Sequence, residues 1–335
     1  MPVTAPPDPP QPPADPSATK RIGIAVVRWF DTAAAETDVT DSDRIDWLRA
    51  LPFLAMHIAC LAVFWVGVSP IAVAVAVALY AVRMFAITGF YHRYFSHKSF
   101  RTSRAVQFTF ALIGASCVQR GPLWWASHHR HHHAHSDTPH DAHSSKQHGF
   151  LWSHLGWFLA RENFAPRNER ISDLMRFPEL RFLDRYDSLV PIALGIALYG
   201  LGEFLRAHFP ALATSGAQLL VWGLCVSTIA LYHAPFTVNS LAHRYGSRRY
   251  ATHDDSRNNL WISLVTLGEG WHNNHHHYAG AARQGFYWWE LDMTYYTLRL
   301  MATLGLIWDL KMIPVKVLAA NRLNAGRTAR AGDRS

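Results

Sequence analysis

The chain has 335 residues, of which 50% are hydrophobic and only 17% are charged. This balance argues against an ordinary soluble protein, in which about 25% of the residues are charged. The net charge of +8 could indicate nucleic-acid binding, but the basic residues are not gathered into a patch with its own fold, so we expect no nucleic-acid partner. The three cysteines lie in apolar surroundings without a C-x-x-C pair, as small core residues of a reducing compartment do; they are Cys60, Cys117 and Cys225.

The start of the chain is rich in proline and carries no signal-peptide pattern. We therefore predict three regions. Residues 1–40 form a disordered leader and linker, residues 41–320 form an integral-membrane domain, and residues 321–335 form a basic flexible tail.

Four apolar segments each have about the length needed to cross the hydrocarbon core of a bilayer. They are residues 51–68, 71–90, 189–205 and 218–236. The sequence thus predicts an all-α protein, a four-helix transmembrane bundle made of two hairpins. A fifth apolar run, from Arg104 to Val118, is short for a crossing, and we interpret it as a surface or re-entrant helix.

Basic residues are concentrated in the long segments that follow the second and fourth spans. The connectors on the other side are Ser69-Pro70 and the stretch around Arg206 to Gly216, which has a single arginine. This asymmetry is the positive-inside pattern, so we expect both termini and the histidine clusters to face the cytoplasm.

Histidines cluster where apolar segments end. The stretch from Trp271 reads W-H-N-N-H-H-H, and three of its imidazoles have i, i+3 and i+4 spacing, which places them on one helix face. S-H-H-R-H-H-H repeats that spacing upstream. The residues are His272, His275 and His276 in the first stretch and His129, His132 and His133 in the second.

Two smaller motifs complete the set. His92 and His97 stand five apart, which is roughly 140° on a straight α-helix, so they serve different metals or straddle a helix end. Asn239 lies four residues before His243 and could complete a metal site directly or through water. Imidazole nitrogen suits zinc, copper, iron or nickel, and nine spaced histidines fit two metals with about four or five nitrogen ligands each.

The remaining histidines of these tracts have a simpler interpretation, because a histidine-rich tract can bind metal nonspecifically. They are His128, His131, His135, His140, His143, His148 and His277. His57, inside the first span, is interpreted as a packed or interfacial side chain.

Two metals beneath membrane helices suggest activation of O2 against an unactivated C–H bond. One alternative is a membrane di-iron hydroxylase of lipids or alkanes. Another is a non-enzymatic membrane metal-binding or transport protein, although transporters usually place polar ligands at mid-bilayer rather than at span ends.

These residues resemble the membrane fatty-acid desaturases of the stearoyl-CoA (delta-9) type, over about Leu51 to Asp292. The shared motifs are H-x-x-x-x-H from His92, H-x-x-H-H from His129, N-x-x-x-H from Asn239 and G-E-G-W-H-N-N-H-H from Gly268.

The resemblance implies four transmembrane helices, a cytoplasmic cap holding a di-iron centre, and a bent hydrophobic tunnel for a long-chain acyl substrate. It implies O2-dependent formation of a cis double bond, with electrons from an external carrier of ferredoxin, rubredoxin or cytochrome type and its reductase. The nine histidines would bind the irons, and Asn239 would hold a water on one of them. Glu269 and Asp255 are candidates for orienting the ligand rings.

Candidate substrate contacts are Trp124 and Trp125 before the second motif, and Arg161, the one cation that matches an Arg-Lys pair of the family. Ser127 and His128 replace an Arg-Asp pair that contacts CoA in the animal enzymes, so a chain bound to phospholipid or carrier protein stays possible. Ala76 and Tyr80 lie where the family closes the far end of the tunnel, and Tyr80 is a candidate chain-length stop.

Overall fold

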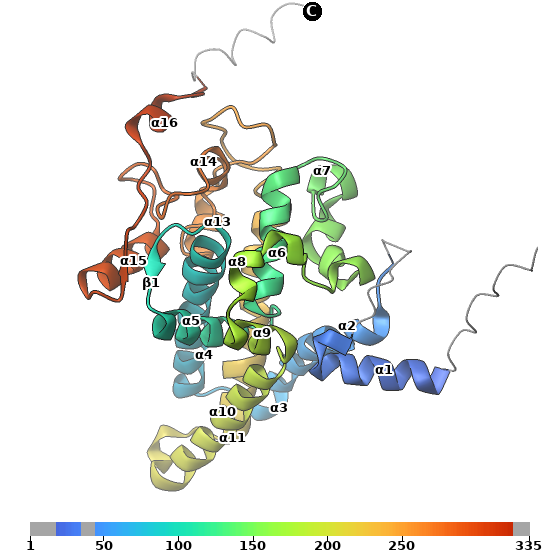
Figure 1. The fold of residues 1–335 in the computed structure, drawn as a ribbon. Coiled ribbons are helices and arrows are strands. Elements are labelled where there is room, and N and C mark those ends of the chain that lie inside the picture. The colour runs from blue at the N-terminus through green and yellow to red at the C-terminus, as the bar shows by residue number, and fades with distance from the viewer. Residues whose placement is uncertain (1–17, 35–43, 324–335) are drawn as a thin grey trace, which may run out of the picture.

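The computed structural model describes residues 18–34 and 44–323, and within them the chain is almost entirely helical (Figure 1). The all-α prediction is confirmed. The proline-rich residues 1–17, residues 35–43 of the predicted linker and the tail from residue 324 lie outside the described residues.

The region predicted as leader contains a helix, α1 (Ala18–Phe30), where we had expected disorder. The prolines end at Pro16, and apolar residues then recur every three or four positions, which gives the helix one apolar face. α1 packs beside α2 (Trp47–Ala59), and the Trp29 indole donates a hydrogen bond to the Leu48 carbonyl at 3.0 Å.

Within the described residues, four helical segments are long and apolar enough to cross a membrane: Trp47–Val66, Pro70–Ser96, Leu189–His208 and Gly216–Ser240. They overlap the four predicted spans. The first consists of α2, a 3₁₀ turn (Cys60–Ala62) and α3 (Val63–Val66); the second of α4 (Pro70–Phe85) and a π-helix (Ala86–Ser96). The third is α10 (Leu189–His208), and the fourth joins α11 (Gly216–Gln218), a π-helix (Leu219–Val226) and α12 (Ser227–Ser240).

Side-chain caps explain where three of these spans begin. Asp46 accepts the Arg49 amide, Ser69 accepts the Ala72 amide, and Ser215 forms a capping box with Gln218. Each cap satisfies a backbone N–H that the first helical turn leaves without an intrahelical acceptor.

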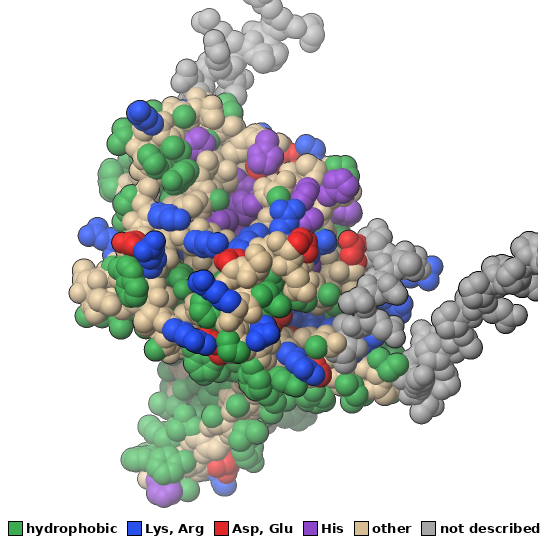
Figure 2. Space-filling model, in the orientation of Figure 1, with side chains coloured by type: hydrophobic (Ala, Val, Ile, Leu, Met, Phe, Trp, Pro, Cys, Tyr) green, Lys and Arg blue, Asp and Glu red, His purple; other side chains and the backbone are tan. Residues whose placement is uncertain are grey.

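The spans form a stalk below a broader body (Figure 1). Hydrophobic side chains cover the stalk, whereas charged and histidine side chains gather on the body above it (Figure 2). Large apolar side chains such as Phe64, Trp65 and Ile196 are exposed on the spans, as expected of a surface that faces lipid.

The third and fourth spans approach each other closely through glycine. A Cβ built on Gly202 of α10 would lie 2.5 Å from the Cα of Gly216. Small residues at such contacts let helix backbones pack tightly in membranes.

Shorter helices form the body above the spans, which we call the cap. They are α5 (Arg104–Ala115), α6 (Pro122–His135), α7 (Ser145–His148), α8 (Ser172–Met175), α9 (Pro178–Arg185), α13 (Leu260–Val265), α14 (His272–His277), α15 (Met293–Thr303) and α16 (Val315–Ala319). The short apolar run predicted from Arg104 is α5. Strands β1 (Arg101–Thr102) and β2 (Ile307–Trp308) pair antiparallel.

Candidate metal centre

Two groups of histidine rings lie next to each other in the cap. The five-histidine cluster contains His92, His97, His129, His133 and His275, and the four-histidine cluster contains His132, His243, His272 and His276. Within each cluster one nitrogen from every residue lies within 4.8 Å of all the others. The structure thus brings all nine spaced histidines together, in groups of five and four.

Nitrogen spacing in the five-histidine cluster suits a metal ion better than hydrogen bonding. Nε2 of His275 lies 3.0 Å from Nε2 of His92 and 2.9 Å from Nε2 of His133. One imidazole nitrogen offers either one proton or one lone pair, so it cannot form both hydrogen bonds. Nitrogen ligands about 2.1 Å from a shared metal, at right angles, would be about 3.0 Å apart.

The four-histidine cluster has the same features. Nε2 of His243 and His272 are 3.0 Å apart. Nε2 of His276 is buried and has no hydrogen-bond partner among the described residues. A buried ring nitrogen without a partner is unfavourable unless a ligand occupies the position in front of it.

His92 and His97 belong to the same cluster because the end of the second span is a π-helix. The π-helix Ala86–Ser96 has i→i+5 hydrogen bonds, and the His97 amide, just past its end, donates to the His92 carbonyl at 3.3 Å. The two ring centroids are 4.9 Å apart. His92 lies within the π-helix and His97 follows its last residue, so the two residues straddle a helix end and their rings lie in one cluster.

Each histidine triplet divides between the clusters. On α6, His129 and His133 turn to the five-histidine cluster and His132 to the other. On α14, His275 joins the five-histidine cluster, and the remaining two join the other. On each helix the two histidines four residues apart belong to the same cluster, and the histidine between them belongs to the other cluster.

Buried carboxylates hold the rings of the four-histidine cluster. Nδ1 of His243 contacts Asp137 at 2.8 Å, and Nδ1 of His132 contacts Asp141 at 3.0 Å. Nδ1 of His276 contacts Asp254. Each contact fixes the ring and directs Nε2 into the cluster, an arrangement typical of metal-binding histidines.

Glu269 plays the same part for the five-histidine cluster. It contacts Nδ1 of His92, accepts from Arg93 at 3.0 Å and accepts from Gln284 at 3.0 Å. Arg93 is fully buried and also pairs with Asp292 at 2.9 Å. This places Glu269 where the sequence suggested.

Asp255 lies elsewhere, so its expected contact with a ligand ring is wrong. Its carboxylate pairs with Lys146 at 2.9 Å and Arg248 at 3.7 Å on the cap surface. Its neighbour Asp254 is buried and contacts Nδ1 of His276, and the backbone amide of Asp255 donates to Asp137 at 2.8 Å. Asp137, Asp141 and Asp254 are ring-holding carboxylates that were not predicted from the sequence, although Asp137 and Asp141 closely follow the histidine motif from His129.

Burial keeps most of the clustered rings neutral. It lowers the pKa of five of them well below the usual range of histidine, and the neighbouring imidazoles lower it further; these are His97, His129, His133, His272 and His275. Burial also lowers the pKa of His276 to about 4, against the opposing effect of Asp254. Burial lowers the pKa of His132 as well, but Asp141 outweighs it and raises the pKa overall. Neutral imidazole is the form that binds a metal.

Of the other histidines, His143 contacts the four-histidine cluster. Its ring stacks on His132 with centroids 4.3 Å apart and lines the cavity described below. With His132 and Asp141 it forms a third potential metal group. Because Asp141 contacts Nδ1 of His132, we interpret this group as support for the four-histidine cluster.

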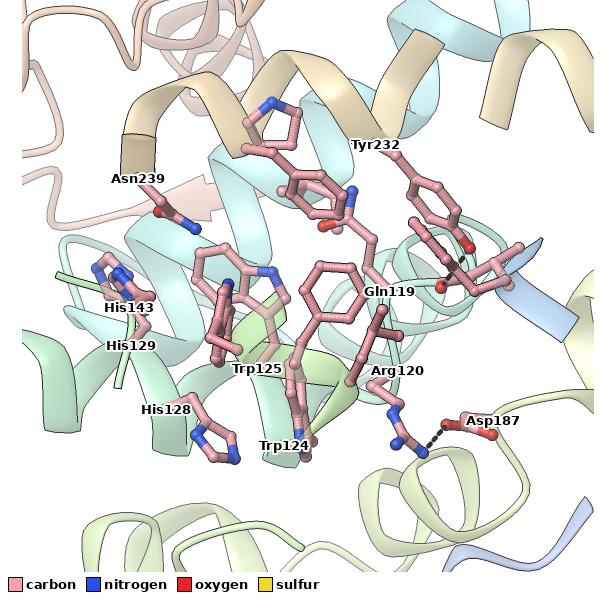
Figure 3. Close-up of a pocket in the computed structure, with 18 of the residues that line it drawn as sticks. Gln119, Arg120, Trp124, Trp125, His128, His129, His143, Asp187, Tyr232 and Asn239 are labelled. Atoms are coloured by element: carbon pink, nitrogen blue, oxygen red, sulfur yellow. Dashed lines mark hydrogen bonds and ion pairs between the residues drawn. The ribbon is translucent and has the colours of Figure 1, made fainter. Parts of the chain in front are cut away.

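An apolar cavity extends from the histidines between the first and fourth spans. Aromatic side chains such as Phe53, Tyr232 and Phe236 form its walls. Trp124 and Trp125, two of the candidate substrate contacts, line it, and the Trp125 ring stacks on His129. Figure 3 shows Asn239 and His129 at one end and Arg120 and Tyr232 at the other.

Three predicted substrate contacts are not among the described residues that line this cavity. Arg161 is half-exposed and lies 3.9 Å from Asp46. The Tyr80 hydroxyl donates to the Val265 carbonyl, and Ala76 is buried on α4.

Known proteins are similar in sequence to this protein over most of its length. The sn-1 stearoyl-lipid 9-desaturase of Anabaena variabilis is 37% identical over 276 residues, which cover 82% of this chain and 96% of that protein. The sn-2 palmitoyl-lipid 9-desaturase of Nostoc sp. (strain 36) is 38% identical over 64% of this chain and 73% of its own. An acyl-CoA 5-desaturase of Anemone leveillei is 36% identical over 77% of each chain.

The model of the fatty acid desaturase family matches residues 69–307, which contain every histidine of both clusters. With the spans, the paired histidine clusters and these relatives, the match shows that the chain belongs to the fatty acid desaturase family.

Proposed function

We propose that the protein introduces a cis double bond at the delta-9 position of a saturated long-chain acyl group, using two iron ions and O2. The observation that carries this proposal is the position of the two clusters at one end of a deep apolar cavity. Two of the relatives named above are 9-desaturases, which supports the delta-9 position.

The residues present fit two metal ions. The five-histidine cluster would hold one and the four-histidine cluster the other, and Asn239, which lines the same cavity, would hold a water on one of them. Histidine-only sites with neutral rings accept iron, although they differ from the carboxylate-rich di-iron sites of four-helix bundles. When bound, the irons would supply the O2 chemistry that breaks two unactivated C–H bonds.

The chain itself would position the substrate and exclude water. An acyl chain in the cavity would lie against Phe53, Tyr232 and Phe236, and Trp125 would hold it beside His129. Removing two hydrogens while reducing O2 to two waters requires two further electrons and two protons. We propose that an external carrier of ferredoxin, rubredoxin or cytochrome type delivers the electrons to the cap.

The distribution of basic residues supports a cytoplasmic cap. Lys98, Arg101 and Arg104 follow the second span, and Arg244, Arg248 and Arg249 follow the fourth. We propose that both termini and the metal centre lie on the cytoplasmic side.

Expression in cells that lack their own desaturase tests the proposal. We expect a new 16:1 or 18:1 fatty acid with the double bond at delta-9, measured by gas chromatography with mass spectrometry. A hydroxylated product without an alkene would instead favour the hydroxylase alternative, and a double bond at another position would overturn the delta-9 assignment alone.

A further inference from the structure

The end of the cavity that lies away from the histidines is polar and positively charged. Arg49, Gln119, Arg120, Asp187 and Ser188 line it. In Figure 3, Gln119, Arg120 and Asp187 lie on the side opposite His129, His143 and Asn239. The hydrocarbon part of an acyl chain cannot form hydrogen bonds or ion pairs with these polar groups.

Several donors at this end are buried and have no partner among the described residues. They are Nε and Nη2 of Arg49, Nε2 of Gln119 and Oγ of Ser188. Arg49 is only 8% exposed. Buried donors are nearly always satisfied in native proteins, so several orphaned donors at one place indicate a ligand with acceptor oxygens.

The charges at this end favour an anion. The guanidinium groups of Arg49 and Arg120 lie 3.9 Å and 4.6 Å from the centre of the Phe164 ring. Of the described residues that line this end, Asp187, 3.6 Å from Arg120, is the one carboxylate, against the two arginines Arg49 and Arg120. The planar guanidinium group of arginine can donate two parallel hydrogen bonds to the oxygens of a phosphate.

The position of these arginines points to a phosphate at the membrane surface. Arg49 is the third residue of the first span. α1 lies beside this point and exposes the apolar side chains Ile22, Val27 and Phe30. A helix with such a face lies in the membrane interface, at the depth of lipid headgroups.

We propose that Arg49 and Arg120, with Gln119 and Ser188, bind the phosphodiester of a glycerophospholipid whose acyl chain fills the cavity. The carrier of the acyl group is then an anionic membrane lipid rather than acyl-CoA. This inference rests on the proposed function, because it takes the cavity to be the acyl site.

The test compares two lipids with identical labelled stearoyl chains, phosphatidylglycerol and a neutral galactolipid, in nanodiscs that contain the full-length protein. Native mass spectrometry measures binding, and membranes from the expressing cells measure desaturation. For Arg49→Gln and for Arg120→Gln we expect phosphatidylglycerol binding, and the ratio of desaturated phosphatidylglycerol to desaturated galactolipid, to fall about tenfold. Arg101→Gln is the control, because Arg101 is 75% exposed on the cap and lies outside the cavity.

Folding is checked by the thermal stability of lipid-free protein. Arg49→Gln removes a buried charge whose Nε and Nη2 have no hydrogen-bond partner among the described residues, but it also removes the contact with the Phe164 ring, so its Tm should stay close to that of the wild type. A lower Tm would assign Arg49 a structural role and overturn its part in the site; Arg120→Gln then tests the site independently.

Unchanged phosphatidylglycerol binding in both variants would overturn the proposal, as would an equal loss with both lipids. An Arg49-dependent reaction of labelled stearoyl-CoA, without reaction of the phospholipid, would assign the site to the phosphates of CoA and overturn the choice of carrier. If the wild type forms no alkene from any substrate, the proposed function fails, whereas the binding measurement still decides whether the phosphate site exists.

Discussion

The carboxylate of Asp254 accepts a hydrogen bond from Nδ1 of His276, while the carboxylate of the next residue, Asp255, pairs with Lys146 on the cap surface. Two adjacent aspartates therefore have different surroundings. One is buried against a ring of the four-histidine cluster, and the other faces solvent.

This difference provides a matched pair of variants. Asp254→Asn weakens the contact that holds the His276 ring, so we expect iron affinity and activity to fall about 10- to 100-fold. Asp255→Asn leaves the ring contacts unchanged and should keep near wild-type iron content. Iron per protein, measured by mass spectrometry on the purified variants, checks the prediction, and equal losses in both variants would contradict it.

The division of the histidines into two clusters predicts separable metal sites. His275→Ala should remove iron chiefly from the five-histidine cluster and His132→Ala chiefly from the other, so each variant should retain about one iron instead of two and lose activity. Membrane insertion should persist, because the four spans do not depend on these side chains. His131→Ala is the control, since its Nε2 contacts the His140 carbonyl outside both clusters. Full activity of either cluster variant after iron removal would show the ligand assignment to be wrong.

The raised pKa of the buried Asp184 leads us to expect that the stability of the protein depends on pH. Burial raises its pKa from 3.8 to about 7, although its carboxylate accepts the Trp124 amide at 2.8 Å. Between pH 4 and pH 7 the unfolded carboxyl is ionised while the folded one keeps its proton, so the unfolded state binds fewer protons. Raising the pH through this window therefore lowers the free energy of unfolding, by up to about 4 kcal/mol.

Asp184→Asn keeps an acceptor for the Trp124 amide and cannot ionise as the pH rises. We expect this variant to match the wild type at pH 4 and to be more stable at pH 8, measured as Tm in detergent. A stability difference that does not change with pH would refute the assignment.

The contact between the third and fourth spans can be tested on one helix. Gly202→Ala places a methyl group against the backbone of Gly216, so we expect a loss of about 1–3 kcal/mol from overpacking. Gly200→Ala, on the same helix, meets nothing within 4 Å and should be neutral or slightly stabilising. Thermal unfolding of both variants in detergent provides the comparison, and the predicted contact is wrong if Gly202→Ala is as stable as Gly200→Ala.

Local pattern was enough to identify the four spans and the nine histidines. The length of an apolar run decides whether a helix can cross a bilayer, and the spacing of imidazoles is visible in the printed residues. Residues 18–30, which fall in the predicted disordered leader, form the helix α1, because the prolines end at Pro16 and the apolar residues that follow have helical spacing.

Which histidines share a cluster was decided by tertiary structure. A straight α-helix would separate His92 from His97, and the π-helix at the end of the second span brings both rings to one cluster. Helix α6 packs against this segment, the His275 ring of α14 contacts His92 within it, and each triplet divides in the same way. The carboxylate contacts likewise join residues far apart in the chain, such as Asp137 and His243. Sequence alone therefore determined the membrane architecture and the kind of ligand, because both depend on residue type and local spacing, whereas helix type and packing determined which rings and carboxylates meet.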